Sequence, residues 1–261
     1  MSESFHGRYV TGSEAKLYTD YRPADGALSL CCYLRSMTSY ALVKWAHVLV
    51  MGYWLGSELV INALTHYVAR TTTLSGAERM RLWDFLLDVD QHVRNALIMS
   101  VPLGFTLAAM LGLVPISGIW MVLLWVASGI WFWFMWLVHW RRKSPEGPTL
   151  ARWDWRLRYP LIAFFAGTGL WSLVAGWPYP THWLALKVLL FAGAMVCGIF
   201  VRYFIREAYR SALPAIAADR ATAADNAEFQ VLMRKGTWAL VVLWVLLFTI
   251  GALGALKPQF G

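Results

Sequence analysis

The stretch Ile119–Trp140, IWMVLLWVASGIWFWFMWLVHW, decides the fold class of this chain. It contains no Asp, Glu, Lys or Arg, and its one histidine, His139, lies at its end. A helix needs about 20 apolar residues to cross the hydrocarbon core of a bilayer, and this stretch is long enough. Arg141-Arg142-Lys143 follow directly, as expected at the cytoplasmic end of a membrane span. The pattern therefore predicts a transmembrane helix.

Other apolar runs of similar length precede and follow this stretch. The predicted spans are residues 38–64, 93–114, 119–140, 159–175, 183–204 and 236–256. Together they predict an all-α, polytopic transmembrane helical bundle of about six spans. Residues 1–37 are expected to form a polar leader without a signal peptide, and residues 257–261 a short tail. Residues 76–91 are interpreted as a short interfacial helix before the second span.

Composition and charge support the membrane assignment. Of 261 residues, 59% are hydrophobic and 15% are charged, whereas soluble proteins carry roughly a quarter charged residues. The net charge of +8 comes from basic residues in the loops after the first, third and fifth predicted spans. We interpret this charge as a topology signal and not as a nucleic-acid footprint. These loops are then cytoplasmic and both termini lie outside, with the lipid bilayer as the expected partner.

The first predicted span carries a stripe of polar and soft side chains. These side chains recur at steps of three or four residues and so share one face of a helix: Lys44, His47, Met51, Trp54, Glu58 and Asn62. Ionisable groups inside hydrocarbon are costly and usually functional. We predict a functional role for His47 because of these neighbours, the alternative being a hydrogen-bonded core histidine. Glu58 is either a proton-relay group or half of an ion pair.

In the fifth predicted span, Lys187 is expected at about the depth of His47. The alternative is that its long side chain extends to the outer interface. Arg202 and Arg206, one turn apart near the other end of this span, are interpreted as positive-inside anchors.

Histidines also lie near the predicted cytoplasmic ends of the first three spans, at His66, His92 and His139. Histidine ligates metals and haem, but a structural role is the simpler interpretation at span ends. The run Asp88–Arg94 places His92 and Asp90 near the start of the second span. Asp90 is predicted to cap that helix, where a carboxylate suits the helix dipole.

His47 and Met51 are four residues apart and could present an imidazole and a thioether to one Cu(I) ion. Methionine also fills membrane cores without any metal. The three cysteines show no zinc or c-type haem spacing.

Two segments resemble a known superfamily. Lys44-Trp45-Ala46-His47, followed by Trp54-Leu55-Gly56, is similar to the opening helix of the copper-resistance D proteins and the HemJ-type protoporphyrinogen oxidases. Trp183-Leu184-Ala185-Leu186-Lys187 resembles a later helix of the same superfamily. The resemblance implies a helical bundle in a bacterial inner membrane, with His47 as a haem b ligand or a copper-path residue and Lys187 near the same site. Gly198 and Arg202 occupy the neighbourhood in which HemJ-type members usually carry a further histidine.

Three hypotheses of function follow. In the first, the chain is a haem b redox or electron-transfer protein, in which His47 ligates iron, Trp54 lies at the cofactor and Lys187 or arginine residues meet the propionates. Its partners are then other membrane or periplasmic redox proteins. In the second, His47 and Met51 handle copper for transport or resistance. In the third, the chain is an accessory membrane subunit without a site of its own. The sequence assigns no catalytic residue.

Overall fold

The computed structural model describes the backbone of residues 26–258 and the side chains of residues 37–258. The predicted polar leader, residues 1–37, therefore lies mostly outside the described residues, as does most of the predicted tail. The elements in chain order are α2 (Gly26–Arg70), α3 (Gly76–Met110), α4 (Ile119–Trp140), α5 (Gly147–Ala175), α6 (His182–Arg210), α7 (Leu213–Ala217) and α8 (Ala223–Leu256). Over this part of the chain the structure contains helices and no strands.

The described residues contain six helices that are long and apolar enough to cross a membrane, namely α2 from Met37, α3, α4, α5, α6 and α8. The chain is thus an integral membrane protein with six spans, as the sequence predicts. Large apolar side chains cover its outer surface, and Trp120, Trp133 and Trp238 are each more than 60% exposed. Such a surface is stable only against lipid, because water would have to solvate all of it.

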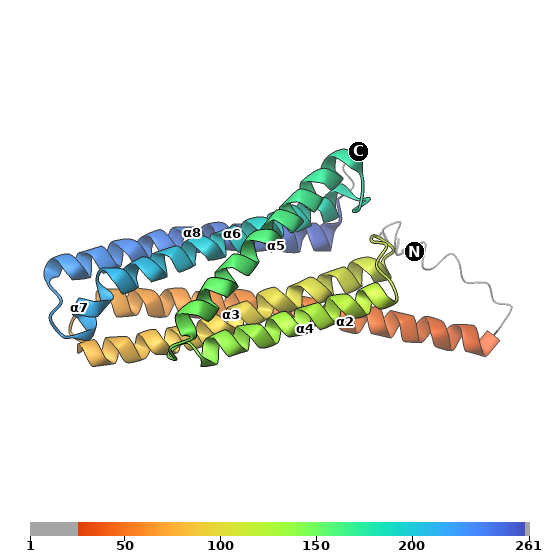
Figure 1. The fold of residues 1–261 in the computed structure, drawn as a ribbon. Helices are drawn as coiled ribbons and strands as arrows, with labels where there is room; N and C mark the ends of the chain where they lie inside the picture. The colour runs from red at the N-terminus through yellow and green to blue at the C-terminus, as the bar shows by residue number, and fades with distance from the viewer. Residues whose placement is uncertain (1–25, 259–261) are drawn as a thin grey trace, which may run out of the picture.

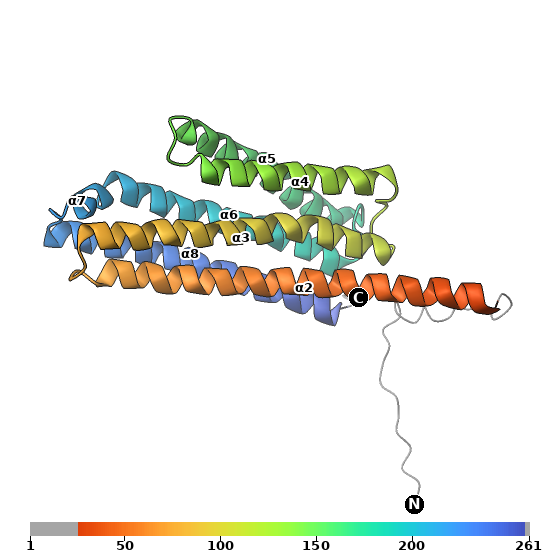
Figure 2. The same ribbon diagram turned by 90° about the horizontal axis from the view of Figure 1, so that it is seen from below.

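The spans form two layers of three helices (Figure 1). One layer runs α2, α3, α4 and the other runs α8, α6, α5, and neighbours within each layer pack along their lengths. Viewed from below, α2 lies over α8, α3 over α6 and α4 over α5 (Figure 2). No Cα atom of α3 approaches a Cα atom of α6 within 8 Å in the described chain. Side chains and cavities therefore fill the space between these two central helices.

The bundle has two ends that differ in charge. The turns at residues 71–75 and 141–146, together with α7, lie at one end, called here the α7 end. The turns at residues 111–118 and 176–181 lie at the opposite end and contain no Lys or Arg. The basic residues of the predicted cytoplasmic loops thus gather at the α7 end. Since the number of spans is even, α2 begins and α8 finishes at the opposite end.

Several helices extend beyond the predicted spans. The predicted interfacial helix at residues 76–91 is wrong, because these residues form the first half of the continuous helix α3. Asp90 consequently lies inside the helix and does not cap it. Ser75 is the N-cap, and its side chain and that of Glu78 form a capping box. Thr222 and Asp225 begin α8 in the same way, so part of the polar stretch before the sixth span is helical.

Candidate functional site

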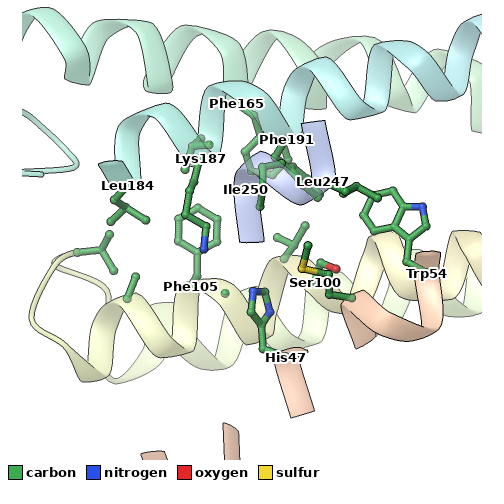
Figure 3. A pocket seen from close by; sticks show the side chains of 16 residues that line it. His47, Trp54, Ser100, Phe105, Phe165, Leu184, Lys187, Phe191, Leu247 and Ile250 are labelled. Carbon is green, nitrogen blue, oxygen red and sulfur yellow. The ribbon is translucent and has the colours of Figure 1, made fainter. Parts of the chain in front are cut away.

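A cavity of about 110 Å³ lies between the two layers, in the half of the bundle nearer the opposite end. His47, Met51 and Trp54 of α2 line it on one side, and Lys187 of α6 lines it on the other. Figure 3 shows the His47 and Lys187 side chains pointing into this space from the two layers. The two residues singled out in different spans of the sequence therefore meet at one site, called here the His47 cavity.

The Lys187 side chain lines the His47 cavity. Its ammonium group lies 6.0 Å from the centroid of the Trp183 ring, one turn nearer the start of α6. An ammonium group inside the bundle is stable only when polar or anionic groups, or the face of an aromatic ring, lie beside it.

Glycines of the neighbouring helices make room for the site side chains. A Cβ atom at each of three glycines would lie close to one of them: 3.4 Å from His47 Cε1 at Gly104, 2.8 Å from Met51 Cε at Gly251, and 2.6 Å from Lys187 Nζ at Gly254. Real Cβ atoms almost never approach other atoms as closely as the last two distances. The glycines of α3 and α8 therefore leave room for these three side chains, and the space is tightest at Gly251 and Gly254.

The remaining walls of the cavity are apolar and largely aromatic, with Phe105, Phe165 and Phe191 among them. The Nδ1 atom of His47 is buried and has no hydrogen-bond partner among the described residues. A buried polar atom without a partner costs free energy, so it calls for an explanation. A ligand bound to the imidazole or beside it is one such explanation.

A second, larger cavity adjoins the first. It measures about 780 Å³, lies among α3, α4 and α5, and is lined almost wholly by apolar side chains. Phe105 and Phe165 border both cavities, and their rings stack with centroids 6.4 Å apart. The two phenylalanines, together with Val101 and Val114, therefore form the wall between the His47 cavity and this apolar cavity.

A cluster of charged side chains lies in the other half of the bundle, toward the α7 end. It comes from four helices and consists of Glu58 on α2, Asp90 and Arg94 on α3, Asp154 and Arg158 on α5, and Arg202 on α6. A small cavity of about 40 Å³ lies among five of these residues, all but Asp154. We call this group the arginine–carboxylate cluster. Trp54 lines both this cavity and the His47 cavity, so its indole separates the two.

Ion pairs hold most of this cluster together. The Arg94 guanidinium donates to Asp90 at 2.5 Å, and the Asp154 carboxylate pairs with Arg158 at 3.2 Å and with Arg202. Asp154 and Arg158 are almost completely buried, at 2% and 3% exposure. Arg202, interpreted from the sequence as a positive-inside anchor, is instead a partner in a buried ion pair. Glu58 is also buried, and Trp54 Nε1 donates to its Oε1 atom at 3.4 Å.

Other candidate residues lie away from both cavities. Lys44 is exposed, with its ammonium 5.8 Å from the centroid of the Tyr40 ring. His92 is exposed and hydrogen-bonds the Tyr53 hydroxyl through Nδ1. Neither residue lines the His47 cavity.

The histidines near the span ends do not come together. His66 hydrogen-bonds Thr237 Oγ1 at 2.9 Å, and His139 Nε2 lies 3.5 Å from Asp88 Oδ1. No group of three or more His, Cys, Asp or Glu side chains suited to a metal ion occurs within the described part of the chain. The simpler, structural interpretation of these histidines therefore agrees with the contacts that they make.

Sequence reasoning missed Asp154 and Arg158, which were assigned to a loop or its border. A signal for them was present, because Asp90 and Arg94 have the same spacing of four residues. Two helices with the same acid-to-arginine spacing in otherwise apolar surroundings predict paired charges that face each other across the bundle.

Comparison of the chain with protein-family models, with curated proteins and with solved structures finds no match. Fold and membrane location are therefore established by the chain's own residues, and its function must be inferred from the site.

Proposed function

We propose that this chain is a membrane redox protein that binds haem b through His47. The observation that carries the proposal is the His47 imidazole, which lines a largely apolar cavity opposite Lys187 and whose buried Nδ1 atom lacks a partner among the described residues. Imidazole is a common axial ligand of haem iron. A cation at the same cavity suits one of the propionates, and aromatic walls suit a porphyrin face.

The His47 cavity alone is too small for a haem. The His47 cavity, about 110 Å³, is smaller than the roughly 300–1,000 Å³ typical of such sites. The adjoining apolar cavity, about 780 Å³, is within that range, and the wall between the two, which also includes Val101 and Val114, is formed largely by Phe105 and Phe165. Movement of these two side chains joins the cavities into a space of the required size.

Haem, when bound, supplies a one-electron redox centre. The chain's own residues perform the other tasks: His47 ligates, Lys187 neutralises an acidic group, and the phenylalanine walls exclude water. The resemblance of the segments around His47 and Lys187 to the copper-resistance D and HemJ-type proteins supports the same proposal. The proposal places the chain in a bacterial inner membrane, where it exchanges electrons with another membrane or periplasmic redox protein.

The test is a reduced-minus-oxidised absorption spectrum of protein purified from haem-sufficient cells. We expect a Soret and an α band that are lost in His47→Ala and kept in His92→Ala. His92 is the matched control because it is an exposed histidine on the neighbouring helix and does not line the cavity. A colourless wild-type preparation, or bands that persist in His47→Ala, would overturn the proposal.

A second candidate function is favoured by Met51. Its thioether belongs to the same cavity as the imidazole one turn away, and the pair suits Cu(I). A cavity of about 110 Å³ holds an ion without any movement of its walls. The Lys187 ammonium opposes a cation there, which is why copper ranks second. Stoichiometric copper in the purified protein, lost in Met51→Leu, together with reduced copper uptake by cells lacking the protein, would favour this function over haem binding.

A further inference from the structure

Glu58 differs from the other carboxylates of the arginine–carboxylate cluster in having no cation as a partner. Asp90 pairs with Arg94, and Asp154 pairs with two arginines. Among the described residues no Lys, Arg or His nitrogen forms an ion pair with Glu58, and the hydrogen bond to its carboxyl comes from the neutral indole of Trp54. Glu58 is 5% exposed and has no ion-pair partner, so some other effect must offset the free energy cost of burying its carboxyl group.

The net charge of the cluster indicates which protonation states of Glu58 are possible. Three guanidinium groups, those of Arg94, Arg158 and Arg202, face two paired aspartates, which leaves one positive charge in excess. An ionised Glu58 makes the cluster neutral, and a protonated Glu58 leaves it with a single positive charge. Burial and the neighbouring Asp90 carboxylate favour the neutral acid, whereas the net positive charge of the cluster as a whole favours the carboxylate. The two effects oppose each other, so both forms are accessible.

Charged groups of three other helices lie near Glu58. On α3 these are Asp90 and Arg94, on α5 Arg158 with its partner Asp154, and on α6 Arg202. The contribution of α8 to the same small cavity is Leu243, which does not titrate. On α2 itself, Trp54 is the neighbour that donates to the carboxyl.

The small cavity beside Glu58 is large enough for water. It measures about 40 Å³, and a site of roughly 10–15 Å³ with several polar partners is enough for one water molecule. The side chains of Asp90 and Arg94 are each 19% exposed and that of Arg202 is 16% exposed, whereas those of Asp154 and Arg158 are 3% and 4% exposed. Asp90, Arg94 and Arg202 therefore form the more accessible side of the cluster, and Asp154 and Arg158 lie deeper.

We propose that Glu58 is a proton-exchanging site, loaded from water through the accessible side of the cluster that Asp90, Arg94 and Arg202 form. The carboxylate takes one proton to become a carboxylic acid, and the charge of the cluster rises by one. This proton uptake has a role that rests on the proposed redox function. It compensates the negative charge of an electron that a redox partner protein delivers to the His47 cavity. Glu58 lies 11 residues beyond His47, about 16 Å along α2, and acts through charge and not by contact.

The experiment is infrared spectroscopy of the full chain in lipid nanodiscs, titrated from acidic to alkaline pH in H₂O and in D₂O. We expect the carbonyl stretch of a protonated carboxylic acid that disappears as pH rises, shifts in D₂O, and is missing in Glu58→Gln. The matched control is Glu228→Gln, the same change at an exposed glutamate of α8, which should keep the band. If Glu58→Gln does not fold, Glu58→Asp is used instead and should move the band while preserving its titration.

A band that is identical in the wild type and in the Glu58 variants, or one that never titrates, would overturn the proposal. The measurement does not depend on haem, so a colourless preparation refutes the haem proposal and leaves this one standing. Conversely, a protein with the expected haem spectrum but no titrating Glu58 band retains its redox site and loses the proton site.

Discussion

The Asp154→Asn substitution tests whether the arginine–carboxylate cluster holds the bundle together. The Asp154 carboxylate forms ion pairs with both Arg158 and Arg202, and its side chain is 3% exposed. Asparagine keeps the shape but removes the charge, so two guanidinium groups remain buried without their anion. Removing one partner of a buried ion pair typically costs about 3–5 kcal/mol. This is a large fraction of the roughly 5–15 kcal/mol that stabilises a folded domain.

The assay is reversible unfolding in mixed micelles with increasing SDS, followed by the fluorescence of the 16 tryptophans. Asp84→Asn is the matched control, since Asp84 pairs with Lys143 at 2.7 Å on the surface, where the two side chains are 37% and 70% exposed. Exposed pairs contribute about 0–1 kcal/mol. A loss of stability for Asp154→Asn that is no larger than that for Asp84→Asn would refute the account of the cluster.

Two further predictions concern glycines. In Gly254→Ala the new methyl group lies 2.6 Å from Lys187 Nζ, so the flexible lysine moves and the bundle stays folded. We expect this variant to retain haem less well on washing and to unfold thermally like the wild type. Gly198→Ala, whose methyl group meets no atom within 4 Å, should change neither haem retention nor unfolding. In Gly169→Ala the methyl group lies 2.8 Å from the backbone nitrogen of Leu189, so α5 and α6 must separate. The expected loss of unfolding free energy is about 1–3 kcal/mol, measured by SDS unfolding. Gly167→Ala on the same helix places its methyl group in open space and should leave the stability unchanged. Equal stability of the two variants would contradict this packing.

The number and position of the spans could be predicted from the sequence because apolar length alone decides whether a helix crosses hydrocarbon. The ends of the helices could not, since beyond the bilayer local capping decides them. The capping box at Ser75 begins α3 well before the apolar run, and the run around Asp90 was mistaken for a helix start. A hydropathy pattern does not register such caps.

The site was predictable in part for a similar reason. Helical spacing placed His47, Met51, Trp54 and Glu58 on one face of α2, and the structure shows three of these four residues at the His47 cavity. What spacing cannot give is which faces of different helices meet. Its position near a span end therefore predicts that Arg202 is a surface anchor. In the structure Arg202 pairs with Asp154, a residue expected outside the span. The four-residue spacing of acid and arginine in α3 and α5 is the sequence feature that carries this information.

The most direct test of the central claim, that the His47 imidazole is the ligand of a redox cofactor, is the chemical rescue of His47→Gly. This substitution removes the imidazole beside Gly104 and leaves a space of its shape. We predict that the purified variant lacks the reduced-minus-oxidised haem spectrum and regains it when imidazole and haem are added together. A variant that shows the wild-type spectrum without added imidazole would place the ligand elsewhere and contradict the claim.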